Sequence, residues 1–101
     1  MTTDTRDTYR EKREAELREW SAKIDQLSAR LDEANAETSA KLKEQLRALE
    51  TKRETAQRKL EELKRASDDA WDDVKEGVES AWGDLRSAVE TAASRVTRAV
   101  S

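Results

Sequence analysis

Apolar side chains in the first two-thirds of the chain recur at the alternating three- and four-residue spacing of a coiled coil. This heptad segment covers residues 9–65, where Ala, Leu, Glu, Lys, Arg and Gln, the strongest helix formers, dominate. A seam that takes two positions in seven is normally buried against another helix. We therefore predict a long coiled-coil helix and assign its seam to an interaction face. The members of that face in this segment are Leu17, Trp20, Ile24, Leu27, Leu31, Leu42, Leu46, Leu49, Leu60 and Leu63.

The heptad pattern is interrupted between Leu31 and Leu42, which are eleven residues apart. The seam must either pass through a stutter there or turn back on itself. The segment 35–39 (NAETS) is the most turn-like in this region, with Thr38 or Ser39 as candidate N-caps. No glycine or proline enforces a turn, so we favour a continuous helix and keep a hairpin broken at 35–39 as the alternative.

From Lys64 onward the repeat lengthens to eleven residues. Three blocks align without gaps: KRASDDAWDDV, KEGVESAWGDL and RSAVETAASRV. Eleven residues make three helical turns, so the apolar positions form one broad stripe. Ser67, followed by Asp68 and Asp69, predicts an N-cap with an acidic first turn, and we expect an amphipathic helix over 67–100. The stripe adds six residues to the interaction face: Trp71, Val74, Val78, Trp82, Leu85 and Val89.

Composition supports an all-α fold in a single domain over residues 1–101, with a frayed, polar N-terminus at 1–8. Hydrophobic residues make up 35% of the chain and charged residues 43%, which is too lean for an ordinary globular core. Proline is absent and glycine occurs only at Gly77 and Gly83, so little in the sequence breaks a helix. Small residues beside the tryptophans would let another helix approach closely: Ala70, Gly77, Ala81, Ala88 and Ala92.

The sequence offers no catalytic constellation, and we expect neither an enzyme nor a cofactor or metal site. Histidine and cysteine are both absent, which removes the commonest general base and thiol nucleophile. The densest carboxylate cluster, from Asp68 to Asp73, is interpreted as a solvated helix start, with loose binding of a hard cation as the alternative. A net charge of −3 disfavours a nucleic-acid partner. The polar N-terminus and the lack of a long apolar run predict a cytoplasmic protein.

Two motifs carry a family resemblance that covers nearly the whole chain. The first is a tryptophan, then K-x-G, then A-W-x-x-L, formed by Trp71, Lys75, Gly77, Ala81, Trp82 and Leu85. The second, E-W-x-x-x-I-D-x-L, is formed by Glu19, Trp20, Ile24, Asp25 and Leu27. Together they resemble small bacterial coiled-coil proteins that respond to stress, a resemblance that implies no particular biochemical activity. In period alone, the repeats are also similar to the amphipathic eleven-residue repeats of apolipoproteins, lipid-droplet coat proteins and desiccation-protective proteins.

These patterns predict a self-associating structural or interaction protein, related to stress if the resemblance holds. A single helix could not bury the heptad seam, so we expect a homo-oligomer, with another protein as an alternative partner. A second hypothesis is a peripheral protein that lies on a membrane surface through the eleven-residue stripe. The six basic and eight acidic residues of 64–101 disfavour it, because anionic lipid would not attract them. A chaperone-like or desiccation-protective chain is the third hypothesis.

Overall fold

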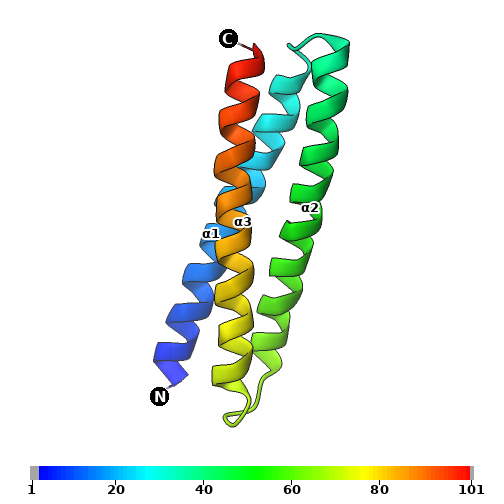
Figure 1. Ribbon diagram of the computed structural model, residues 1–101. Coiled ribbons are helices and arrows are strands. Elements are labelled where there is room, and N and C mark those ends of the chain that lie inside the picture. Colours follow the sequence, from blue (N-terminus) through cyan, green and yellow to red (C-terminus); the bar gives the residue numbers. More distant parts are fainter. Residues whose placement is uncertain (1–2, 101) are drawn as a thin grey trace.

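The computed structural model describes the backbone of residues 3–100 and the side chains of residues 5–100. The chain forms three helices that run up, down and up the long axis of one bundle (Figure 1): α1 (Thr3–Leu31), α2 (Ala36–Arg65) and α3 (Trp71–Val100). The bundle is elongated, with extents of 51 × 18 × 15 Å. The predicted all-α fold is confirmed.

The heptad segment turns back on itself, so the favoured continuous helix is wrong and the hairpin alternative describes the chain. α1 ends at Leu31 and α2 begins at Ala36. The N-cap is Asn35, whose side chain accepts a hydrogen bond from the Thr38 amide at 2.9 Å. The predicted caps, Thr38 and Ser39, lie inside the first turn of α2 instead. An asparagine cap can end one helix and start the next without glycine or proline, because its side chain satisfies an orphan amide.

The second turn includes Ser67, where the change of period predicts a helix start, but α3 itself begins four residues later, at Trp71. The amide of Ala70 points to the Ser67 hydroxyl at 3.3 Å, and the Trp71 amide donates to the Ser67 carbonyl at 2.9 Å. Ser67 therefore organises the turn from which α3 emerges. At the other end of the chain, the expectation of a frayed segment at 1–8 is wrong for residues 3–8, which are helical; residues 1 and 2 lie outside the described part.

The interaction face predicted from the sequence forms the core of the bundle. Leu17, Trp20 and Val74 are partly buried, and the other thirteen members are buried, together with Ala56, Ala92 and Val96. The heptad seam and the eleven-residue stripe are therefore buried against each other within the same chain. The seam no longer requires a second copy, and any self-association must use a different surface.

Helix α1 is fastened to the bundle unevenly along its length. Its fully buried leucine and isoleucine side chains begin at Ile24, while Tyr9, Leu17 and Trp20 are only partly buried. Arg53 lies between α1 and α2; it contacts Glu50 at 3.0 Å and approaches the Ser21 hydroxyl at 3.5 Å. The first half of α1 is therefore held by polar contacts together with the partly buried Tyr9, Leu17 and Trp20.

Candidate functional site

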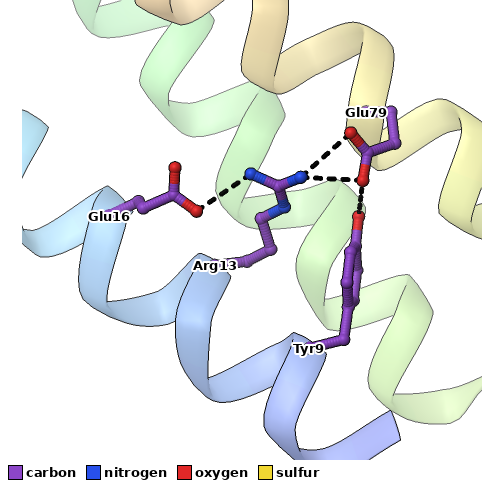
Figure 2. A network of polar contacts seen from close by, with 4 residues as sticks. All are labelled: Tyr9, Arg13, Glu16 and Glu79. Atoms are coloured by element: carbon purple, nitrogen blue, oxygen red, sulfur yellow. Dashed lines mark hydrogen bonds and ion pairs between the residues drawn. The ribbon is translucent and has the colours of Figure 1, made fainter. Parts of the chain in front are cut away.

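Four side chains join the first half of α1 to α3 (Figure 2), and we call them the polar clasp: Tyr9, Arg13, Glu16 and Glu79. The Tyr9 hydroxyl donates to Glu79. One terminal nitrogen of Arg13 donates to both carboxylate oxygens of Glu79, at 2.8 and 2.9 Å, and the other donates to Glu16 at 2.9 Å. Since Tyr9, Arg13 and Glu16 occupy successive turns of α1, a single carboxylate on α3 holds about two turns of that helix.

Aromatic contacts continue the clasp toward the end of the bundle. The Arg6 guanidinium lies 4.8 Å from the centre of the Trp71 ring and pairs with Asp68 at 2.5 Å. The Tyr9 ring meets Trp71 edge-on, with centroids 6.2 Å apart, and the Lys75 ammonium lies 4.9 Å from the Tyr9 ring. Cations over aromatic faces are attracted by the ring quadrupole. This end of the bundle is thus closed by charge and aromatic contacts.

The protonation behaviour of the clasp indicates a fastening rather than an acid–base centre. Burial, reinforced by the hydrogen bond to Glu79, raises the pKa of Tyr9 above its ordinary value. The hydrogen bond from Tyr9, reinforced by Arg13, lowers the pKa of Glu79. Burial disfavours the charge on Arg13, but its contacts with Tyr9 and Glu79 outweigh that effect and raise its pKa. All three shifts lead away from neutrality, whereas a general acid or base works best with a pKa near the ambient pH.

Two of the three tryptophans, Trp71 and Trp82, are buried in the bundle, and Trp20 is partly buried. Trp71 is 5% exposed and Trp82 is 2% exposed. Trp20 packs on Trp82 with ring centroids 6.1 Å apart. The indole nitrogens of Trp71 and Trp82 are buried without a hydrogen-bond partner among the described residues. Burial of an unsatisfied donor costs roughly 1–3 kcal/mol, so the two indole N–H groups lower the stability of the folded bundle.

The acidic start of α3 shows no metal-binding geometry. Asp68, Asp69, Asp72 and Asp73 are all exposed, and Asp68 is engaged by Arg6. Within the described residues, no group of three or more acidic side chains is placed to hold a metal ion. The described helices also include none that is long and apolar enough to cross a membrane.

The larger surface hollow, of about 540 Å³, lies between α1 and α2. Leu17 and Leu60 line it, but its rim is charged. Lys64 pairs with Glu14 at 2.8 Å and with Glu61 at 3.3 Å. The hydrogen bond from Lys64 lowers the pKa of Glu14. Several of the rim charges thus already neutralise each other within the chain.

A second hollow, of about 370 Å³, lies between α2 and α3, and we call it the α2–α3 groove. Helix α2 contributes Gln45, Ala48, Leu49 and Lys52. The α3 side consists of small side chains between one acid and one base: Asp84, Ser87, Ala88, Thr91, Ala92 and Arg95. A smaller hollow continues it past Thr51, Thr55 and Ala81. The floor of the groove could admit another helix at short distance, because no long side chain of α3 stands between its two charged ends.

The charged residues at the ends of the groove lack partners among the described residues. Across residues 5–100, no ion pair or hydrogen bond engages Asp84, Arg95 or Lys52. The sequence itself explains this for Asp84 and Arg95, because neither has an opposite charge three or four residues away on α3. By contrast, Arg86 pairs with Glu90 at 3.3 Å on the same helix. The groove therefore presents one free acid and one free base along α3, separated by small residues.

Sequence reasoning found the core but missed both of these surfaces. The polar clasp begins at Tyr9, directly after the segment expected to fray, and its partners are 66 and 70 residues apart in sequence. The groove has one sequence signal, the small residues at Ala81 and Ala88, which the sequence marks as allowing close helix approach. A second signal was overlooked: neither Asp84 nor Arg95 has an oppositely charged residue three or four positions away on the same helix.

Comparison with protein-family models finds no match, and searches of curated proteins and of solved structures find none either. The resemblance to stress-responsive coiled-coil proteins therefore remains an expectation from two sequence motifs. The function has to be argued from the surfaces of the bundle.

Proposed function

We propose that this protein is a non-enzymatic structural module that associates with a second copy of itself through the α2–α3 groove. The observation that carries the proposal is the groove itself: a small-residue floor with Asp84 and Arg95 at its ends, both without partners. The pKa shifts of Tyr9, Arg13 and Glu79 all lead away from neutrality, and the hydrophobic core is buried. A stress-related role is a further part of the proposal that rests on the sequence motifs.

We take a second copy as the occupant because its own groove offers a base for Asp84 and an acid for Arg95. Any surface that presents one acid and one base can satisfy both against an identical surface related by a two-fold axis. The small residues between them allow the backbones to approach to about 8–10 Å, the ordinary spacing of packed helices. Because the core is complete within each chain, the association is reversible and does not drive folding.

The test is the mass of the protein in solution, measured by light scattering and sedimentation from low to high micromolar concentration. We expect the wild-type mass to rise toward that of a dimer. Ala88→Trp fills the groove and should remain helical and monomeric. The matched control is Ala22→Trp, which places the same bulk in the hollow between α1 and α2 and should associate like the wild type.

Two outcomes contradict the proposal. One is a wild-type protein that stays monomeric at high micromolar concentration. The other is an Ala88→Trp variant that associates as strongly as the wild type. If Ala22→Trp alone abolishes association, the copies meet at the α1–α2 hollow and the groove is not the docking surface.

One observation favours a second candidate function, binding to a lipid surface. The indole nitrogens of Trp71 and Trp82 are buried without acceptors, and tryptophan is favoured at membrane interfaces, where its N–H finds partners. This function requires α1 to leave α3, since the apolar stripe is now in the core. Blue-shifted tryptophan emission already in buffer, unchanged by zwitterionic or anionic vesicles, would exclude it.

A further inference from the structure

We infer that the second copy inserts its own α3 into the groove, antiparallel to the first, with Arg95 of each copy against Asp84 of the other. The inference rests on the proposed self-association. It adds which helix occupies the groove, in which direction and in which register. The partner copy thereby contributes two charged residues to a site that is incomplete without it.

The spacing of the two charges sets the direction. Asp84 and Arg95 are eleven residues apart, which is three helical turns and about 16.5 Å along the axis, at nearly the same angle around it. They are too far apart to pair within one chain. A copy of α3 that runs in the opposite direction presents its base level with the first acid and its acid level with the first base. One arrangement therefore satisfies four charges with two reciprocal ion pairs.

The residues between the charges permit the close contact that this register needs. When Asp84 is level with Arg95 of the copy, Ala88 is level with Thr91 and Ser87 with Ala92. Every facing pair is small, so nothing holds the two backbones apart. The other wall of the groove, on α2, is also small at Ala48, which leaves room for a helix to sit between α2 and α3.

Other arrangements of the same two helices lose these contacts. In a parallel pair, Asp84 would face Asp84 and Arg95 would face Arg95, and like charges repel. A shift of the antiparallel register by one turn places Arg95 against Ser80 or Ala88, so both charges again lack partners. Lys52 lines the Asp84 end of the groove without pairing with it, and Asp84 is the one acid among the residues that line the groove.

Charge reversal on one helix gives a test whose rescue can only be intermolecular. Asp84→Arg places arginine against arginine at both contacts of the dimer, and Arg95→Asp places acid against acid. Each variant alone should self-associate about tenfold more weakly, as expected for two exposed ion pairs turned into repulsions. An equimolar mixture of the two should form a heterodimer of wild-type strength, because both contacts become attractive again. The double variant should also recover.

The matched control reverses a pair outside the groove on the same helix, by Arg86→Glu and by Glu90→Arg. These variants should associate like the wild type. Circular dichroism checks that each variant stays helical, which is expected because Asp84 and Arg95 are exposed. High salt should weaken the wild-type dimer and remove the difference between matched and mismatched charges.

The outcomes separate this inference from the proposed function. If the wild type dimerises and Ala88→Trp abolishes the dimer, but the mixture of Asp84→Arg and Arg95→Asp shows no gain over either variant alone, the groove docks a second copy in another register and the inference is wrong. If neither charge reversal weakens association, the inference is equally wrong. A wild type that never dimerises removes the proposed function and the inference together.

Discussion

Removal of the contact between Arg13 and Glu79 should release the first half of α1 while the remainder of the bundle stays folded. Before Ile24, α1 places no fully buried aliphatic side chain in the core. The polar clasp therefore holds this part of the helix together with the partly buried Leu17 and Trp20. The perturbation is Arg13→Ala, Glu79→Ala and the double variant, which together form a thermodynamic cycle.

The expected magnitude follows from the contact geometry. Arg13 donates to both oxygens of Glu79 at 2.8 and 2.9 Å; its side chain is 16% exposed, and that of Glu79 is 47% exposed. A hydrogen bond to a charged group contributes roughly 1.5–3 kcal/mol, and the exposure of Glu79 screens part of it, which leaves a coupling of about 1–1.5 kcal/mol. For a domain of this size, 1 kcal/mol corresponds to roughly 4–8 °C in Tm.

Urea denaturation of the four proteins measures the coupling, and amide hydrogen exchange shows where the chain opens. The matched control is the same cycle on Arg86 and Glu90, an exposed pair within α3, where we expect about 0.3–0.5 kcal/mol. Exchange should accelerate in the first turns of α1 in Arg13→Ala and remain slow around Leu85. A coupling no larger than in the control cycle, or unchanged protection in α1, would refute the idea that the clasp holds this helix.

Three further predictions test other parts of the structure. The pKa of Glu79 is lowered in the folded state, so its contribution to stability is complete above the ordinary carboxyl range and is lost as the pH falls through the lowered pKa. When urea denaturation is compared at neutral and acidic pH, Glu79→Gln should therefore lose less stability than the wild type. Gly83→Ala should raise the free energy of unfolding by about 1 kcal/mol, because an added Cβ meets nothing within 4 Å, and a decrease would contradict this. Replacing Trp71 and Trp82 by Ala should cost about 3–5 kcal/mol each in thermal or urea unfolding, whereas unchanged stability would show that they are not core residues.

The sequence predicts which residues form the core, because burial repeats with the period of the helix. The heptad seam and the eleven-residue stripe together name Ile24, Leu60 and Val78 among the buried positions, and all three are at most 3% exposed. The periods also place the change of helix near Ser67. These inferences are local: each needs only the phase of apolar residues along a few turns.

The turn at 32–35 could not be decided in the same way. A stutter in a continuous helix and a reversal of the chain both keep Leu31 and Leu42 on the seam, and the local sequence contains no obligatory breaker. Whether the helix continues or turns back depends on which helix buries the seam. In this chain α2 and α3 are available to α1, so reversal buries the seam without a second molecule. Asn35 supports that outcome, but an exposed asparagine occurs in many helices.

The polar clasp and the α2–α3 groove are the least visible in the sequence for a related reason. Tyr9 and Arg13 lie in a polar stretch that has little periodicity, and their hydrogen-bond partner, Glu79, is on another helix. Local patterning cannot reveal a contact across 66 residues. Reciprocal features such as Asp84 and Arg95 are easier to recognise, since the absence of any partner at three or four residues is itself a sequence property.

Closure of the core within one chain determines what kind of assembly the protein can form. In a two-chain coiled coil, dissociation exposes the seam, so assembly and folding are lost together. In the dimer that we propose, dissociation would expose only the residues of the α2–α3 groove, and each monomer would keep its core of leucines, valines, Trp71 and Trp82 buried. Dilution through the monomer–dimer transition should therefore change the mass while the helical circular dichroism signal stays constant. If helicity falls in parallel with the mass, the copies share the core, and the closed three-helix bundle is not the form in which the protein assembles.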